Sequence, residues 1–384
     1  MTRVLIVTND YPPRNGGIQS FVHALATRLP ADGVVVYAPA WPGAAEFDAR
    51  QPFPVVRHPR SLMLPLPAVG SRACALLAEY GCDRVLFGAA APLGLLAPRL
   101  RRAGAQRIVG LTHGHEAGWA ALPGARSLLH RIGDEVDVLT YLAEYFRIRL
   151  ARALSAQAAG RMVKLAPGVD PAEFRPGAGG GRIRGQLGIA PGRPVVVCVS
   201  RMVPRKGQDT LIRAWPLVRS GLAARSGLAT DPLLLLVGDG PDRQRLARLA
   251  DAAGVADSVV FTGPVSPADL PAYYDAGNVF AMPCRTRRGG LDVEGLGIVY
   301  LEASATGLPV VGGDSGGAPD AVLAGETGYV VPGRNVAALA ERLTALLSDP
   351  AGAAAMGDKG RGWIEREWTQ DLVARRLQDI LAGG

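Results

Sequence analysis

Several features that would narrow the function at once are missing from this sequence. Its four cysteines show neither CxxC spacing nor a disulfide pattern, which indicates a reduced, cytoplasmic setting. No apolar run reaches the roughly 18 residues that a membrane span needs. The first ten residues, "MTRVLIVTND", lack the apolar segment and cleavage site of a signal peptide, and they predict a β-strand instead.

What is present points to a globular protein of two domains. The chain has 384 residues, 48% of them hydrophobic and 20% charged. Its net charge of +8 is uneven: residues 1–170 hold 19 basic and 12 acidic residues, whereas the remainder hold 23 and 22. Either the arginines are scattered over a solvated surface, or the N-terminal half meets an anionic partner, such as a lipid surface, a phosphorylated acceptor or nucleic acid.

Short apolar runs rich in β-branched residues alternate with helical patterns along the whole chain. Continuous apolar strands separated by helices are typical of parallel sheets buried on both faces. The runs are "RVLIVTN", "VVVYAP", "PVVRH", "DRVLFG", "RIVGLTHG", "VDVLTYL" and "MVKLAPG", and then "PVVVCVS", "LLLLVGDG", "VVFTGPV", "VFAMP", "LPVVGGD" and "GYVV". The predicted fold class is therefore α/β, with two doubly wound parallel-sheet domains.

A Gly- and Pro-rich stretch, residues 166–182, is the predicted boundary. We expect an N-terminal domain over residues 1–168 and a second domain over residues 169–364. The chain after Met356 has a helical pattern, and we expect residues 365–384 to pack back on the first domain. Ligands of open parallel sheets bind beyond the carboxyl ends of the strands, so residues that follow strands are the candidate site.

Two such loops belong to the first half. "NDYPPRNGG" precedes a predicted helix near Ile18, and Gly16 and Gly17 allow a ligand to approach the backbone. The same letters also suit an ordinary turn. "THGHE" places His113 and His115 after a strand. They lack the spacing and the third ligand of a zinc site, so a hydrogen-bonding role is favoured.

The second half carries cations and carboxylates after its strands. Arg201 and Lys206 follow "PVVVCVS", where two cations before a helix suit a diphosphate, although a solvated basic loop is the alternative. Glu294 lies in a Gly-rich loop, and Glu302 lies within the helix that this loop opens. The two carboxylates are therefore expected to contact different parts of one elongated ligand, with the helix N-terminus between them. A sugar nucleotide fits this order.

Together these motifs resemble the retaining glycosyltransferases with two facing Rossmann-like domains, the GT-B architecture. The resemblance covers nearly the whole chain and rests on E-x7-E after a Gly-rich loop, Arg-x4-Lys after a strand, and the GG turn. Longer stretches, "TNDYPPRNGGIQS", "RKGQDTLI" and "RTRRGGLDVEGLGIVYLEA", are similar to actinobacterial phosphatidylinositol mannoside mannosyltransferases. That family uses GDP-mannose and adds mannose to an inositol lipid at the inner membrane face.

The resemblance implies a role for each matching residue. It assigns the sugar to Glu294, the ribose to Glu302, the strand-end catalytic histidine to His113, with His115 as its rival, and the base to the chain near Val265. The implied catalytic set is His113, Glu294, Arg201 and Lys206. The implied donor-binding set is Gly16, Gly17, Arg201, Lys206, Val265, Glu294, Gly295, Leu296, Gly297 and Glu302, and the implied acceptor-side set is Asp10, Gln19, Arg60 and His115.

The motifs contain no obvious nucleophile, so same-face attack is favoured over a double displacement. No Asp-x-Asp occurs, and we expect cations and a helix dipole to replace a divalent metal, with no cofactor required. Three alternatives stay open: another nucleotide sugar with a different acceptor, a glycoside hydrolase built on the two glutamates, and a basic binding protein without catalysis.

The expected location is cytoplasmic, at the inner face of the cell membrane, with an anionic membrane surface as partner and no nucleic acid. "RHPRSLMLPLPAV" (residues 57–69) is predicted to be a loop of basic and then apolar residues, and "YFRIRLARAL" a basic helix. Apolar residues beside cations suit a peripheral enzyme that reaches a lipid head group. A buried loop and a solvated arginine face would give the same pattern.

Overall fold

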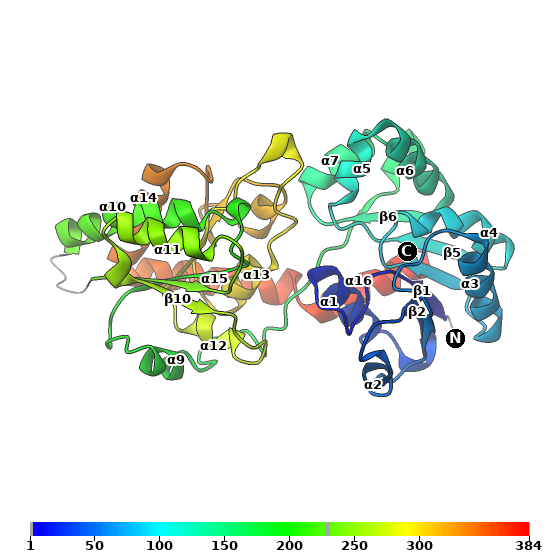
Figure 1. The fold of residues 1–384 in the computed structure, drawn as a ribbon, viewed down its shortest axis with the longest axis horizontal. Helices are drawn as coiled ribbons and strands as arrows, with labels where there is room; N and C mark the ends of the chain where they lie inside the picture. Colours follow the sequence, from blue (N-terminus) through cyan, green and yellow to red (C-terminus); the bar gives the residue numbers. More distant parts are fainter. Residues whose placement is uncertain (1–2, 227–230, 384) are drawn as a thin grey trace. The chain divides into compact units, whose positions relative to one another are not determined.

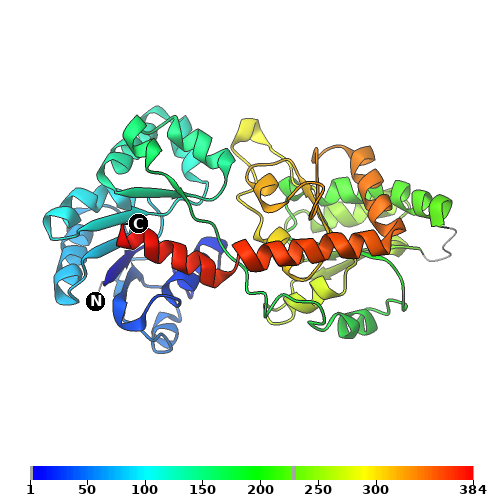
Figure 2. The same cartoon turned by 180° about the vertical axis from the view of Figure 1, so that it is seen from behind.

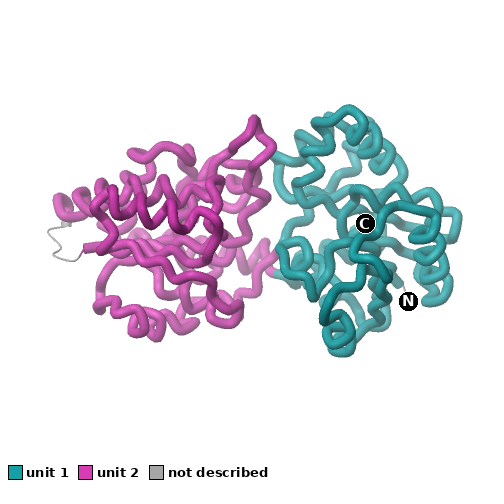
Figure 3. Tube along the Cα trace, viewed as in Figure 1, with its two compact units in different colours: residues 1–167, 370–384 teal, residues 168–369 magenta. Residues whose placement is uncertain are grey.

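The computed structural model describes residues 3–226 and 231–383. The chain divides into two compact units (Figure 3): unit 1 contains Met1–Pro167 and Gln370–Gly384, and unit 2 contains Gly168–Thr369. Each unit is built on one parallel sheet flanked by helices (Figure 1). The α/β class with two doubly wound parallel-sheet domains is confirmed.

The sheet of unit 1 has the strand order β3-β2-β1-β4-β5-β6-β7, and every pairing is parallel. All seven strands coincide with the apolar runs of the first half. Their bounds are β1 Val4–Val7, β2 Val34–Pro39, β3 Val55–His58, β4 Arg84–Phe87, β5 Arg107–Gly110, β6 Val138–Tyr141 and β7 Val163–Lys164.

The helices of unit 1 lie between these strands, except for one that comes from the end of the chain. Their bounds are α1 Gly17–Ala26, α2 Ala44–Asp48, α3 Pro67–Glu79, α4 Ala97–Arg102, α5 Glu116–Ala121, α6 Pro123–Glu135, α7 Glu144–Ala151, α8 Ala156–Gly160 and α16 Gln370–Ala382. Two short 3₁₀ turns accompany them, η1 Ala31–Gly33 and η2 Leu93–Leu96.

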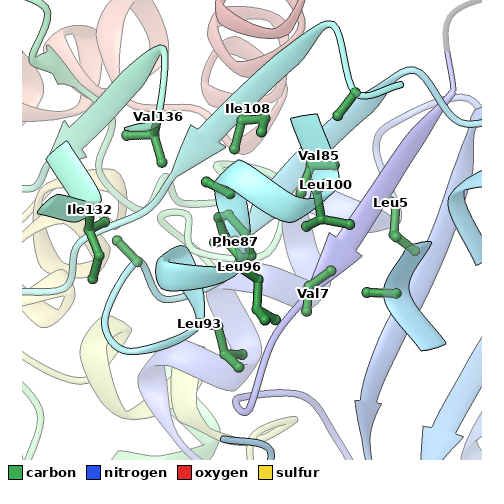
Figure 4. Packing of buried hydrophobic residues seen from close by; sticks show 14 of the residues in the cluster. Leu5, Val7, Val85, Phe87, Leu93, Leu96, Leu100, Ile108, Ile132 and Val136 are labelled. Carbon is green, nitrogen blue, oxygen red and sulfur yellow. The ribbon is translucent and has the colours of Figure 1, made fainter. Parts of the chain in front are cut away.

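Alternate residues of the interior strand β1 point to opposite faces of the unit 1 sheet, so each face has its own core. Leu5 and Val7 belong to one core, part of which is drawn in Figure 4 with residues of β4, η2 and α4. Val4 and Ile6 belong to the other. That second core also takes in one face of α16, formed by Val373, Leu377, Ile380 and Leu381.

Polar contacts fasten α16 to unit 1 as well. Arg84 and Arg107 donate to the carbonyls of Leu381 and Ile380 at 2.9 and 3.1 Å. Figure 2 shows α16 lying along this unit. The last helix therefore completes a sheet face that the first 167 residues leave uncovered.

Unit 2 contains a six-stranded parallel sheet of order β10-β9-β8-β11-β12-β13. Its strands are β8 Val195–Val199, β9 Leu233–Val237, β10 Val259–Gly263, β11 Val279–Met282, β12 Val310–Gly313 and β13 Gly328–Val331. Its α-helices are α9 Gly180–Gln186, α10 Gln208–Ser226, α11 Arg243–Ala252, α12 Leu270–Asp275, α13 Ile298–Ala305, α14 Val336–Ser348 and α15 Pro350–Glu367. Its 3₁₀ turns are η3 Pro204–Lys206, η4 Ala256–Ser258, η5 Arg288–Gly290 and η6 Ala318–Ala321.

Candidate active site

The loop after β8 carries the cations predicted to bind a diphosphate. Lys206 ends the turn η3, and α10 begins at Gln208. The Gln208 amide fastens the loop, since its Nε2 donates to Ser200 Oγ at 2.8 Å and to the Arg201 carbonyl at 3.2 Å. The side chain of Lys206 is only 11% exposed, whereas Arg201 is exposed. Lys206 is thus built into the loop, and Arg201 lies at its solvent side.

Lys206 contacts Glu294, one of the two carboxylates singled out in the sequence. Lys206 Nζ lies 2.7 Å from Glu294 Oε2, and the Glu294 side chain is 7% exposed. The contact is an ion pair without hydrogen-bond geometry, because Oε2 is buried and has no hydrogen-bond partner among the described residues. The contact follows from topology: β8 and β11 are parallel neighbours, so the loops beyond their carboxyl ends meet.

Two further residues of this cluster were not singled out from the sequence. Arg205 Nε lies 3.8 Å from Glu294 Oε2, and its guanidinium lies 3.5 Å from Asp292 Oδ1. Both residues stand beside recognised positions, Arg205 before Lys206 and Asp292 two residues before Glu294. Their positions close to Lys206 and Glu294 are the signal by which the sequence could have pointed to them. The sequence does not show, however, that the two loops meet.

A buried ion pair underlies the same two loops. Arg285, which follows β11, lies 2.8 Å from Asp209 Oδ1 and donates to Thr210 Oγ1 at 3.1 Å. Its backbone N–H donates to the Arg205 carbonyl at 2.8 Å. Arg285 therefore joins the loop that carries Glu294 to the loop that carries Lys206, and it holds the two at a set spacing.

The N-terminus of α13 follows a glycine and carries no side-chain cap. Its N-cap, Gly297, has φ 79° and makes no side-chain capping bond. A Cβ there would lie 2.5 Å from the Tyr300 ring, which is held by a 2.7 Å bond from its hydroxyl to the Met282 carbonyl. Space is open at Gly295, and Leu296 is buried. The first amides of the helix thus have no side-chain cap, as an anion site requires.

Glu302 lies in the second turn of α13 and is bound by Tyr274, whose hydroxyl donates to Oε2 at 2.6 Å. Burial raises the pKa of Glu302 from its ordinary 4.5 to about 7. The Tyr274 hydrogen bond opposes this rise, and the neighbouring Glu173 carboxylate adds to it. Glu302 is therefore poised to change its protonation near neutral pH.

The remaining donor candidate, Val265, is half-buried just after β10. Because β10 is the edge strand, two positions from β8, Val265 stands apart from the Lys206–Glu294 contact along the sheet.

In unit 1, the turn after β1 is built around Asp10 and Gln19. Gln19 Nε2 donates to Asp10 Oδ1 at 2.7 Å, and Thr8 Oγ1 accepts from the Asp10 amide at 2.9 Å. A Cβ at Gly16 would lie 2.1 Å from Gln19 Oε1, so a larger residue there would displace the Gln19 side chain from its present position. Nothing lies within 4 Å of a Cβ built on Gly17, where α1 begins. Two of the predicted acceptor-side residues thus bind each other.

His113 follows β5 and is fixed at both its backbone and its ring. Its amide donates to Glu116 Oε2 at 2.9 Å, and its Nε2 lies 2.5 Å from the Gly88 carbonyl. Since a carbonyl only accepts, Nε2 carries the proton and Nδ1 keeps its lone pair. Burial lowers the pKa of His113, and the nearby Glu116 carboxylate partly offsets this. The ring is therefore neutral at pH 7.

His115 has a different setting. Its side chain is 45% exposed, with Nε2 3.4 Å from Glu116 Oε1. Its ring stacks on that of His113, with centroids 6.2 Å apart. Of the two histidines, His113 is the less exposed, and its tautomer is defined by the Gly88 carbonyl.

The segment 57–69 departs from the predicted loop at both ends, because Arg57 belongs to β3 and α3 begins at Pro67. Arg57 is not a surface cation. It binds Asp48 at 2.7 and 3.0 Å and donates to the carbonyls of Pro12 and Pro39 at 2.7 and 2.9 Å. Arg60, by contrast, is exposed. The expectation of a basic loop therefore fails at Arg57, which joins the loop after β1 to the end of β2 and to α2.

The middle of this segment presents leucines to solvent. Asn9 binds the backbone of Met63 twice, donating to its carbonyl at 2.9 Å and accepting from its amide at 2.7 Å. Met63 is fully buried, whereas the flanking side chains are open: Leu62, Leu64 and Leu66 are 55%, 44% and 50% exposed.

The arginines of α7 differ from a bare basic face. Arg147 pairs with Glu144 at 2.6 Å, and Arg149 stacks 4.2 Å from the Tyr145 ring centroid. Arg152 lies just past the helix end, at its C-cap.

Comparison with known proteins shows the family of this chain. Residues 181–363 match the family model described as "Glycosyl transferases group 1", and residues 15–173 match "Glycosyltransferase Family 4". A protein of Mycolicibacterium smegmatis, named GDP-mannose-dependent alpha-(1-6)-phosphatidylinositol monomannoside mannosyltransferase, is 51% identical over 99% of this chain and 98% of its own. The chain belongs to the same glycosyltransferase family as this protein.

Two more matches describe how far the similarity of this glycosyltransferase extends. A mannosyltransferase of Corynebacterium glutamicum, named for a monoacylated form of the same acceptor, is 44% identical over 99% of this chain and 97% of its own. The solved structure of Anabaena HepE in complex with UDP has a TM-score of 0.79 at 19% identity, covering both chains completely. The latter likeness shows the GT-B fold alone.

Two further features of the described part of this glycosyltransferase concern membrane spans and metal-binding clusters. In residues 3–226 and 231–383, no helix combines the length and apolar character of a membrane span. Within the same residues, no group of three or more histidine, cysteine or acidic side chains gathers as a metal-binding cluster.

Proposed function

We propose that this glycosyltransferase transfers mannose from GDP-mannose to a phosphatidylinositol mannoside lipid. The observation that carries the proposal is the contact of Lys206 with Glu294 beside the uncapped N-terminus of α13. A cation and free helix amides suit a diphosphate, and a carboxylate suits sugar hydroxyls. The donor and acceptor are those in the names of full-length relatives 44–51% identical to the chain.

The roles within the donor site follow from chemistry. Lys206, the α13 amides and the exposed Arg201 bind the diphosphate, Glu294 binds mannose, and the carboxylate of Glu302 accepts from the ribose hydroxyls. In unit 1, the neutral His113 presents its Nδ1 lone pair to a sugar hydroxyl, and Asp10 with Gln19 orients the acceptor. His113 is kept as the catalytic histidine, and His115 remains its less buried rival.

The proposed reaction retains the configuration of the sugar. The bond between mannose C1 and the diphosphate oxygen breaks, the acceptor oxygen bonds C1 from the same face, and its proton passes to the departing phosphate. Lys206 and Arg201 stabilise the charge on that leaving group. We propose that these cations act without a divalent metal, so EDTA should leave the rate unchanged.

The enzyme is proposed to work peripherally, at an anionic membrane surface. The exposed leucines 62, 64 and 66 stand beside the exposed Arg60 and are supported by the buried Met63. Apolar side chains next to a cation favour the interface of an anionic bilayer.

A thermal-shift panel of nucleotide sugars tests the donor. GDP-mannose should raise the melting temperature, since a ligand at a hundred times its dissociation constant stabilises by about 2.7 kcal/mol. Lys206→Ala should abolish the rise. Strong stabilisation by a UDP-sugar, with none by GDP-mannose, would refute the proposed donor. Transfer of radiolabelled mannose to lipid extracts then tests the acceptor.

A further inference from the structure

Lys206 and Glu294 have separate tasks in the proposed function, yet each is the other's nearest opposite charge. Their ion pair is 2.7 Å long, and their side chains are 11% and 7% exposed. At such low exposure the attraction is screened little by solvent. A diphosphate oxygen that approaches Lys206 therefore meets an ammonium already held by a carboxylate.

We infer that Glu294 is an internal counter-ion that competes with the donor diphosphate for Lys206. The inference rests on the proposed function, since it takes Lys206 as a diphosphate ligand. Binding exchanges one anion for another at the ammonium. The Glu294 carboxylate becomes available to the sugar hydroxyls only when the diphosphate has taken its place.

The neighbouring side chains provide a second partner for the released carboxylate. Arg205 Nε lies 3.8 Å from Glu294 Oε2, beyond hydrogen-bond distance. Both atoms are buried and lack a hydrogen bond within the described residues. Buried polar atoms usually have a hydrogen-bond partner. Two neighbouring buried atoms that lack one therefore indicate a second arrangement of the side chains, in which the two atoms bind each other. A small movement of the carboxylate from Lys206 toward Arg205 would satisfy both.

The backbones of the two loops that carry Lys206 and Glu294 are fixed relative to each other. Arg285 fixes the spacing of the two loops through its bonds to Asp209 and to the Arg205 carbonyl. The exchange therefore needs only side-chain rotation, not a rearrangement of the loops. A mannose that lacks a diphosphate therefore encounters the Glu294 carboxylate while it is still paired with Lys206.

Calorimetric titration with GDP, and separately with inorganic pyrophosphate, tests the inference on the full chain. Glu294→Gln keeps the shape but removes the competing charge, so it should tighten binding of both ligands about tenfold. In a Lys206→Met background the same substitution should change neither affinity. Asp292→Asn is the matched control, because it removes a nearby negative charge that pairs with Arg205, not Lys206. It should have a much smaller effect.

Unchanged or weaker pyrophosphate binding in Glu294→Gln would overturn the inference, and so would tightening that persists in the Lys206→Met background. The shorter carboxylate of Glu294→Asp gives an independent measurement, with intermediate tightening expected. Pyrophosphate carries neither base nor sugar, so this result stands apart from the donor assignment. A wild-type protein that prefers another nucleotide would refute GDP-mannose while leaving the competition at Lys206 measurable.

Discussion

The Tyr274 hydroxyl donates a 2.6 Å hydrogen bond to Glu302, a carboxylate whose pKa burial has raised to about 7. The folded protein thus holds this proton more tightly than the unfolded chain, where the pKa is near 4.5. The stability that Glu302 contributes is fully present below that value and is lost as the pH rises through about 7. In its proposed role the ionised form of Glu302 accepts from ribose hydroxyls, so nucleotide binding should have the opposite trend.

We therefore predict that GDP affinity increases as the pH rises through about 7. Glu302→Gln should weaken GDP binding even without a sugar and leave only the pH dependence of the GDP phosphates. Tyr274→Phe removes the hydrogen bond that favours the ionised Glu302 carboxylate. The pH at which GDP affinity reaches half of its increase should therefore be higher in this variant. Calorimetry across this range checks both variants. Identical pH profiles for the wild type and Glu302→Gln would contradict the role given to Glu302.

The two stacked histidines should differ in catalysis. His113→Ala is expected to lower kcat by about a hundredfold, since the lost Nδ1 acceptor belongs to a fixed neutral ring. His115→Ala serves as the matched control and should change kcat little, because that ring is 45% exposed. GDP affinity should be unchanged in both, because neither histidine belongs to the proposed donor-binding residues. A larger loss in His115→Ala than in His113→Ala would reverse the assignment.

Two arginines of the segment 57–69 should differ in how much they contribute to the free energy of unfolding. Arg57→Met leaves the Asp48 carboxylate unpaired and frees two carbonyls, so it should cost about 3–5 kcal/mol in the free energy of unfolding. Arg60→Met, at an exposed site, should stay within about 0.5 kcal/mol. Urea denaturation measures both. Equal stability of the two variants would show that the Arg57 bonds contribute nothing net.

Membrane docking is expected to depend on the leucines that Met63 supports. Leu62→Asp with Leu64→Asp should reduce co-sedimentation with phosphatidylinositol vesicles and transfer to a lipid-embedded acceptor, while GDP binding is kept. Leu217→Asp, at a leucine of unit 2 that is 49% exposed, is the control and should bind vesicles normally. Added salt should weaken wild-type binding. A double variant with full activity on membranes would place docking elsewhere.

The sequence alone determined the fold class and the strands. Each of the thirteen apolar runs became a strand of a parallel sheet. The interior strands, such as β1, β8 and β9, are buried along their whole length and therefore need continuous apolar residues, which are visible in the sequence. It also placed Glu294 in the loop before α13 and Glu302 within the helix, since glycines and helix periodicity are local signals.

Only the tertiary structure decided which polar groups meet. Lys206 and Glu294 are 88 positions apart in the numbering, and they pair because β11 lies beside β8 in the sheet. Arg57 looks like a surface cation in the sequence, yet it is held by Asp48 and by the carbonyls of Pro12, in the loop after β1, and Pro39, at the end of β2. Strand order and the pairing of polar side chains are set by packing across the sheet, and periodicity along the chain predicts which positions are apolar but not which strands or polar groups become neighbours.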